Sequence, residues 1–183
     1  MAAALAGCSG EPRGSQVRVV DLLKQVGHAE KRPLDGAFPI AEHTLQGVAR
    51  ASLVAPAASR VTWLQALPRR GTLHTDVAVP PASGHAVVAF RVGISDDRIY
   101  ETLLERQVSS DPARGWTPLA ADLSRYAGPQ FSLFYRPDRR RWRLVLAATP
   151  VEGAPGVVFW GAPGIDTDAA AARRFFADHQ GTK

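Results

Sequence analysis

The stretch that decides the fold reads DLSRYAG at residues 122–128, followed by FSLFY at 131–135 and, later, by WGAPGI at 160–165. In the first motif an aspartate and a serine cap a short turn, and Gly128 can take the positive φ that re-aims the backbone into the next strand. Tyr126 can bury its ring against a sheet and return its hydroxyl to a nearby backbone group, as in a tyrosine corner. The stretch therefore predicts a corner of a β-sandwich.

The motifs resemble those of galactose-binding-like jelly rolls, including the carbohydrate-binding-type modules appended to bacterial sulfatases and glycosidases. In that group Asp-Leu-Ser-x-Tyr-Ala-Gly leads into a late strand and Trp-Gly-x-Pro-x-Ile closes the domain, an order that this chain keeps over roughly residues 44–166. The resemblance implies a non-catalytic β-sandwich that in relatives often meets sugar. It assigns no binding residues, because those modules place their ligands on variable loops.

Short apolar segments recur from residue 44 onward and are separated by Pro, Gly and Asp clusters. They lie at 45–54, 60–67, 72–79, 86–94, 99–108, 131–135, 142–147 and 157–160. Several alternate with period two, which is typical of strands with one buried face. The pattern predicts a mainly β fold, an antiparallel sandwich of the jelly-roll type.

Short helical segments are expected on either side of this sandwich. Residues 17–26 fit a helix with one apolar face and fit a first strand equally well. Residues 167–178 contain an alanine run, which predicts a terminal helix capped by Asp166 or Thr167. The predicted organisation is a signal and tether at 1–16, a helical or irregular extension at 17–43, the sandwich at 44–166, and a helix and tail at 167–183.

Composition fits one globular domain and does not favour a nucleic-acid partner. The chain has 183 residues, of which 45% are hydrophobic and 21% charged. The net charge of +5 is carried mainly by arginine beside heavy use of Ala, Gly and Pro, a pattern that fits a GC-rich coding sequence. No helix-turn-helix, RNP-like or zinc-finger spacing accompanies the charge.

The single cysteine predicts the location of the protein. Cys8 follows Leu-Ala-Gly and resembles a bacterial lipobox, in which the cysteine thiol receives a diacylglycerol and becomes the new N-terminus. A secretory signal needs a basic start and an apolar core of ~7–15 residues, more than residues 1–7 contain, so the true start codon is expected upstream. The interpretation predicts a membrane-anchored lipoprotein of the bacterial cell envelope, on the periplasmic face or in the outer membrane. The alternative is a chance match in an alanine-rich segment.

The remaining candidate residues are few and point away from catalysis. The sequence has no His-Glu-x-x-His, no Gly-x-Ser-x-Gly and no phosphate loop, so we expect neither an enzyme nor a resident cofactor. Asp96 and Asp97, in a turn between two predicted strands, are candidate Ca²⁺ ligands, and aspartates are also good turn formers. The basic run at 139–141 fits a solvated hairpin turn or a contact with phosphate or acidic glycan.

Trp116 is the candidate for contact with sugar. An exposed aromatic face can stack on the apolar side of a pyranose while polar side chains bind its hydroxyls. The polar residues that accompany Trp116 in sequence are Arg98, Asp111 and Arg114. The other interpretation makes Trp116 a core residue, as we expect Trp63, Trp142 and Trp160 to be.

These patterns together predict a non-enzymatic, lipid-anchored envelope protein whose sandwich binds carbohydrate or another envelope component. The alternative is a structural or scaffold domain that mediates protein-protein contacts in an envelope complex. An enzyme would need a carboxylate pair in one cleft, and no sequence motif supports one.

Overall fold

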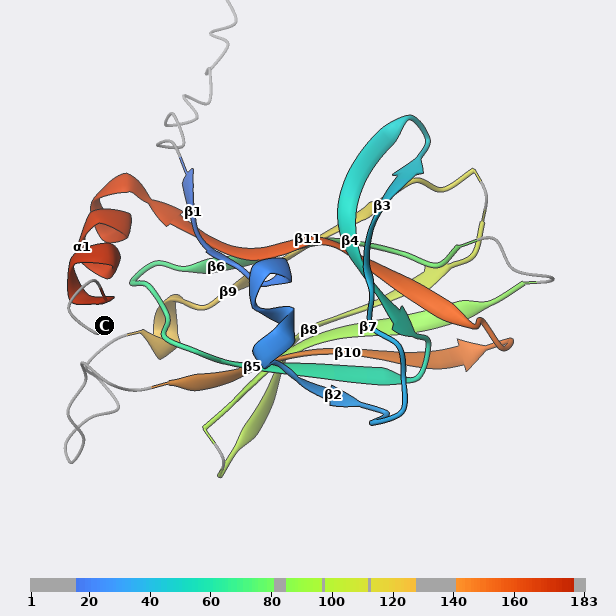
Figure 1. The fold of residues 1–183 in the computed structure, drawn as a ribbon, viewed down its shortest axis with the longest axis horizontal. Coiled ribbons are helices and arrows are strands. Elements are labelled where there is room, and N and C mark those ends of the chain that lie inside the picture. The colour runs from blue at the N-terminus through green and yellow to red at the C-terminus, as the bar shows by residue number, and fades with distance from the viewer. Residues whose placement is uncertain (1–15, 81–84, 97, 112, 128–140, 180–183) are drawn as a thin grey trace, which may run out of the picture.

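The chain folds as two antiparallel β-sheets packed face to face (Figure 1). The computed structural model describes residues 16–80, 85–96, 98–111, 113–127 and 141–179. Sheet A contains β1 (Gln16–Asp21), β3 (Ile40–Leu45), β4 (Val48–Pro56), β6 (Thr72–Ala78), β9 (Thr117–Asp122) and β11 (Val157–Asp168). Sheet B contains β2 (Glu30–Arg32), β5 (Ser59–Gln65), β7 (Val87–Ser95), β8 (Tyr100–Ser109) and β10 (Trp142–Glu152). The helical segments are η1 (Leu23–His28), η2 (Ser124–Tyr126) and α1 (Ala169–His179).

The strand order is that of a jelly roll. Sheet A runs β3-β4-β11-β6-β9 and sheet B runs β2-β5-β10-β7-β8, with β1 added beside β11. From β4 onward the chain passes repeatedly from one sheet to the other, so β4-β11-β6-β9 faces β5-β10-β7-β8 and forms the double Greek key. The predicted fold class is therefore confirmed.

The sandwich strands begin earlier than residue 44. Residues 17–26 contain both predicted structures, because β1 is a strand of sheet A and η1 follows it as a short 3-10 helix. β2 and β3 also join the two sheets. The predicted extension at 17–43 is thus part of the sandwich. β2 and β3 escaped prediction because they are short edge strands with little apolar alternation.

The WGAPGI motif lies inside β11, the long last strand of the sandwich. β11 pairs with β4 through residues 157–161 and with β1 through residues 164–168. Between them the pairing with β6 shifts register, and Ala162 takes a φ of 43°. The bulge separates the segment of β11 that pairs with β4 from the segment that pairs with β1.

The core between the sheets is built around tryptophans. Trp63 and Trp160 are almost fully buried, and Phe90 meets Trp160 edge-to-face at a centroid distance of 5.0 Å. Trp142 is buried as well and packs against Tyr126 at 5.2 Å. These three tryptophans occupy the core positions that the sequence predicts.

The corner around Tyr126 forms with a different hydroxyl partner from the one expected. The Ser124 N–H donates to Asp122 Oδ1 at 2.8 Å, which caps the turn as predicted. The buried Tyr126 hydroxyl donates to the Glu101 carboxylate on β8 at 2.5 Å instead of returning to the backbone. This hydrogen bond, followed by the one from Arg125, holds the pKa of Glu101 below its usual value. Gly128 and residues 131–135 lie outside the described residues.

The C-terminal helix is present but begins later than predicted. The Ala171 N–H donates to Asp168 Oδ1 at 2.8 Å, so Asp168 takes the capping role expected of Asp166 or Thr167. Those two residues are still paired in β11, which continues to Asp168. In the described part of the chain no helix is long and apolar enough to cross a membrane.

Asp168→Ala is expected to lower the free energy of unfolding by about 1 kcal/mol, because it removes the acceptor for an otherwise unpaired N–H of the first helical turn. Urea denaturation measures the change. Asp178→Ala, at the other end of the same helix, is the control and should alter stability by less than about 0.5 kcal/mol. Equal losses in the two variants would contradict the capping role.

Candidate ligand-binding face

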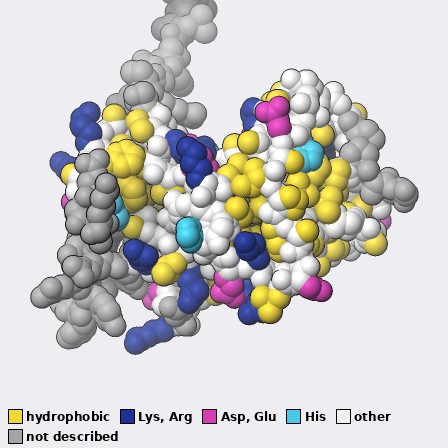
Figure 2. Space-filling view, viewed as in Figure 1, with side chains coloured by type: hydrophobic (Ala, Val, Ile, Leu, Met, Phe, Trp, Pro, Cys, Tyr) yellow, Lys and Arg dark blue, Asp and Glu magenta, His cyan; other side chains and the backbone are white. Residues whose placement is uncertain are grey.

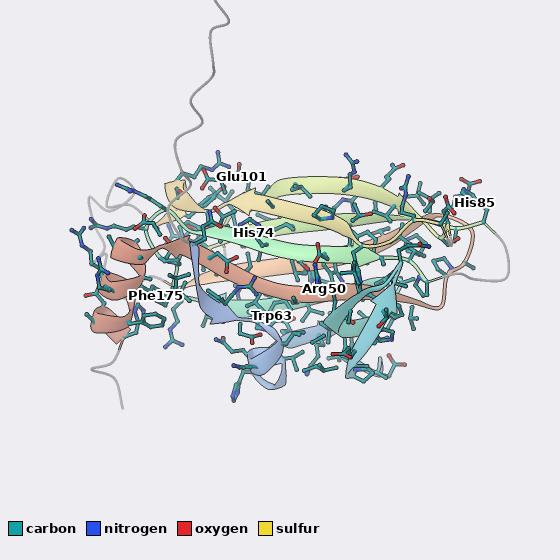
Figure 3. The ribbon with its side chains drawn as sticks, turned by 90° about the horizontal axis from the view of Figure 1, so that it is seen from above. Arg50, Trp63, His74, His85, Glu101 and Phe175 are labelled. Atoms are coloured by element: carbon teal, nitrogen blue, oxygen red, sulfur yellow. The ribbon has the colours of Figure 1, made fainter. Side chains whose placement is uncertain are left out.

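The outer face of sheet A gathers side chains from four strands. Ser52 on β4, Gly161 on β11 and Asp76 on β6 are direct cross-strand partners, so they form one row across the face. Phe159 lies two residues before Gly161 and therefore points the same way. Figure 3 looks onto these strands, with Arg50 labelled among them.

Three aromatic rings meet on this face, and we call them the aromatic patch: His43, Phe159 and Trp116. The His43 ring stacks on Phe159 with a centroid distance of 3.9 Å and an interplanar angle of 30°. The centroid of the Trp116 ring lies 6.3 Å from that of Phe159, and the two rings are tilted by 46°. Hydrophobic side chains gather below the β3–β4 hairpin in the space-filling view (Figure 2).

The Trp116 indole is fixed in place by a hydrogen bond and by a glycine. Its Nε1–H donates to the Val48 carbonyl at 2.9 Å, which joins the loop before β9 to the β3–β4 hairpin. A Cβ at Gly161 would lie only 3.0 Å from Trp116 Cζ3, so any other residue there would force the indole to move by a few tenths of an ångström. Trp116 remains half-buried on the outer face and is not a core residue.

Polar groups with fixed geometry border the aromatic patch. Arg50 Nε donates to Asp76 Oδ2 at 2.7 Å, and both side chains are partly exposed. His43 Nδ1 lies 3.0 Å from the hydroxyl of the buried Ser52, which sets the plane of the ring. Because Arg50 and Asp76 neutralise each other, this border offers hydrogen-bond donors and acceptors with little net charge.

Asp111 and Arg114, two of the predicted polar companions, precede Trp116 by five and two residues on the loop before β9. Asp111 Oδ1 accepts the Ala113 N–H at 2.9 Å, and the Arg114 N–H donates to the Asp111 carbonyl at 3.0 Å. Arg98 instead lies in the turn between β7 and β8, at the opposite end of the ten-residue strand β8 from Asp111. A strand of that length spans roughly 33 Å, so Arg98 does not join this face.

Asp96, one of the two candidate calcium ligands, shapes the β7–β8 turn. Its Oδ1 accepts the N–H groups of Arg98 and Ile99 at 3.1 and 3.0 Å. Asp97 and Cys8 lie outside the described residues, as do Arg139 and Arg140. Among the residues that are described, no group of three or more His, Cys, Asp or Glu side chains is placed to hold a metal ion.

Of the other residues on the outer face of sheet A, only Phe159 could have been suspected from the sequence. Phe159 precedes Trp160 in one strand, and adjacent strand residues point to opposite faces. A strand that places large aromatics on both faces indicates that its outer side is also occupied. His43, Arg50 and Asp76 carry no such signal, because their proximity depends on the pairing of β3, β4, β11 and β6.

Comparison with known proteins gives similarities of fold type only. No protein-family model matches the chain, and no curated protein matches it. Among solved structures, it resembles the CBM51-2 and INT domains of Clostridium perfringens ZmpB, with 10% identity and a TM-score of 0.48. That match covers 85% of this chain but only 28% of the other.

Two further similar structures match over most of their own length. The CBM22-1 xylan-binding domain of Paenibacillus barcinonensis Xyn10C has 15% identity and a TM-score of 0.47, over 77% of this chain and 86% of the other. The mannan-recognising carbohydrate-binding module TmCBM27 has 11% identity and a TM-score of 0.44, over 85% and 96%. The jelly-roll assignment of this chain rests on its own strand order.

Proposed function

We propose that this protein is a non-enzymatic carbohydrate-binding domain whose ligand lies on the outer face of sheet A. The observation that carries the proposal is the half-buried Trp116 indole, held over Gly161 beside Phe159. A core tryptophan would pack between the two sheets, whereas the Trp116 indole lies on the outer face of sheet A, over Gly161. The arrangement supplies an aromatic surface that is rigid before any ligand arrives, which lowers the entropy cost of binding.

The polar border suits the hydroxyls of a sugar. A pyranose has an apolar face of C–H groups that can lie on an aromatic ring, and equatorial hydroxyls that need donors and acceptors around its edge. Arg50 supplies guanidinium N–H donors and Asp76 supplies carboxylate acceptors beside the aromatic patch. Asp111 and Arg114, on the loop that carries Trp116, are the further groups that a longer glycan would meet.

We also propose that the domain is held on the bacterial envelope by a lipid on Cys8. The support is the Leu-Ala-Gly-Cys lipobox and the polar, Gly- and Pro-containing segment at 9–16 that follows it. A polar tether of this composition would let an anchored domain stand away from the bilayer. A glycan-binding face on such a domain would engage envelope or extracellular polysaccharide.

Trp116→Ala is expected to weaken glycan binding by about tenfold or more, because it removes the largest contact surface of the site. A glycan array identifies the ligand of the wild-type protein, and isothermal titration calorimetry of that glycan compares the variants. Trp116→Phe keeps a ring and should lose less affinity. Phe176→Ala, an exposed aromatic on α1, is the matched control and should bind as the wild type does.

Circular dichroism separates loss of the site from loss of the fold. The Trp116→Ala spectrum should match that of the wild type, because the indole lies outside the core. Wild-type protein that binds no glycan on the array, or a Trp116→Ala variant with undiminished affinity, would show that the proposed site is wrong.

A further inference from the structure

The outer face of sheet B repeats the arrangement found on sheet A. Tyr100, the first residue of β8, is 51% exposed. A Cβ added to Gly93 on β7 would meet the Tyr100 hydroxyl and would lie 2.5 Å from its Cζ and 2.6 Å from its Cε2. The phenol ring therefore rests on the sheet surface only because residue 93 has no side chain.

Both glycines lie at irregularities of their sheets. The β7–β8 pairing shifts register between Val92 and Gly93, and the β11–β6 pairing shifts between Gly161 and Gly164. A bulge twists the strand locally and re-aims side chains. On each face, then, a bulge and a glycine together let an aromatic ring lie against the sheet while part of it stays open to solvent.

An arginine–carboxylate pair accompanies the ring on this face too. Arg91 Nε donates to Glu105 Oε2 at 2.7 Å, the same donor atom and distance as in the Arg50–Asp76 pair. Arg91 lies two residues from Gly93, so it shares its face at a spacing of about 7 Å. The hydrogen bond to Glu105 raises the pKa of Arg91 above its usual value, so the guanidinium stays charged and paired.

We infer that the outer face of sheet B is a second glycan-contacting site, centred on Tyr100 and bordered by Arg91 and Glu105. This inference rests on the proposed function. The preferred ligands of both faces are neutral sugars, because each arginine already has a carboxylate partner and keeps donors for hydroxyls without a free positive charge for an anion.

The two sites point in opposite directions. Packed sheets lie about 10 Å apart, and each outer face adds its own layer of side chains. A glycan that lies along one face cannot reach the other ring without leaving the first. One domain can therefore hold two separate sugar chains, and a polysaccharide network would be cross-linked by it.

Nuclear magnetic resonance of the ¹⁵N-labelled full chain tests the inference. The probes are neutral hexasaccharides of different linkage: xylohexaose, cellohexaose, mannohexaose and chitohexaose. The Trp116 indole N–H reports on sheet A and the Gly93 amide N–H reports on sheet B. We expect at least one of these sugars to shift both signals, with a dissociation constant for each.

Variants then separate the two faces. Tyr100→Ala is expected to raise the dissociation constant read at Gly93 about tenfold and to leave the value read at Trp116 unchanged. Gly93→Ala should weaken the same site, because the new methyl group displaces the ring. In a Tyr100→Ala background, Gly93→Ala should have no further effect on binding. Ile99→Ala, the neighbouring exposed residue, is the control and should change the constant less than twofold.

The two reporters distinguish failure of the sheet B site from failure of the sheet A site. Shifts at Trp116 without shifts at Gly93, or a Tyr100→Ala variant with unchanged binding at Gly93, would overturn the inference and leave the proposed function standing. Shifts at Gly93 alone would support the sheet B site and refute the proposed sheet A site. No shift at either reporter with any of these sugars would overturn both.

Discussion

Replacing Trp160 with alanine is expected to destabilise the domain by about 3–5 kcal/mol, the loss typical of a large aromatic removed from a packed core. Its side chain has no measurable exposure and meets Phe90 edge-to-face between the two sheets. The sandwich has little material near this point to refill the space, because Leu53 and Val77, its partners on β4 and β6, are already packed. Since whole domains are stable by only 5–15 kcal/mol, a measurable fraction of the variant should be unfolded.

Urea denaturation followed by tryptophan fluorescence and circular dichroism measures this change. Trp160→Phe is the graded comparison. Trp160 Nε1 finds no hydrogen-bond partner among the described residues, so phenylalanine loses volume but no hydrogen bond and should cost less than the alanine variant.

The neighbouring residue provides a matched control on the same strand. Phe159→Ala removes an aromatic from the opposite face of β11, where the aromatic patch lies. Phe159→Ala should lower the free energy of unfolding less than Trp160→Ala does. The ratio of lost glycan affinity to lost stability should be larger for Phe159→Ala. A loss of less than about 1 kcal/mol in Trp160→Ala would mean that Trp160 does not anchor the core.

The strands of the fold were predictable where their alternation was strong. Most segments from residue 48 to 109 appear within a few residues of their predicted bounds, because hydrophobic residues with period two must face a common core. β9 was missed. It contains Pro118 and two alanines, a composition that suits a short edge strand and resembles a loop.

The candidate site was predictable only in part. Trp116 could be chosen because an aromatic in a predicted loop can stack on a sugar, with a core position as the alternative. Its partners could not, since Val48, Phe159 and Gly161 reach it through strand pairings between segments far apart in the chain. The sequence contained Gly93 and Tyr100 seven residues apart, but only the β7–β8 register shows that the ring crosses the glycine.

The proposed anchor leads to the prediction with the largest expected effect on location. If Cys8 is acylated, protein made from the longest reading frame should partition almost entirely into the detergent phase of a Triton X-114 extraction. Each buried methylene contributes about 0.8 kcal/mol, and two or three acyl chains together hold a protein stably on a bilayer. Metabolic labelling with a clickable palmitate analogue should mark the same protein.

Cys8→Ser removes the thiol that accepts the lipid, so the label should disappear and the protein should remain as uncleaved precursor or enter the soluble fraction. Ser9→Ala is the matched control, since it alters the neighbouring residue and leaves the thiol in place; it should still be labelled. Glycan binding by the Cys8→Ser domain should be unchanged, because the residues assigned to the two proposed faces all lie after residue 16. Wild-type protein that takes up no label and stays in the cytoplasm would show that the lipobox match is coincidental, and the envelope assignment would then be withdrawn while the glycan-binding proposal stood on its own geometry.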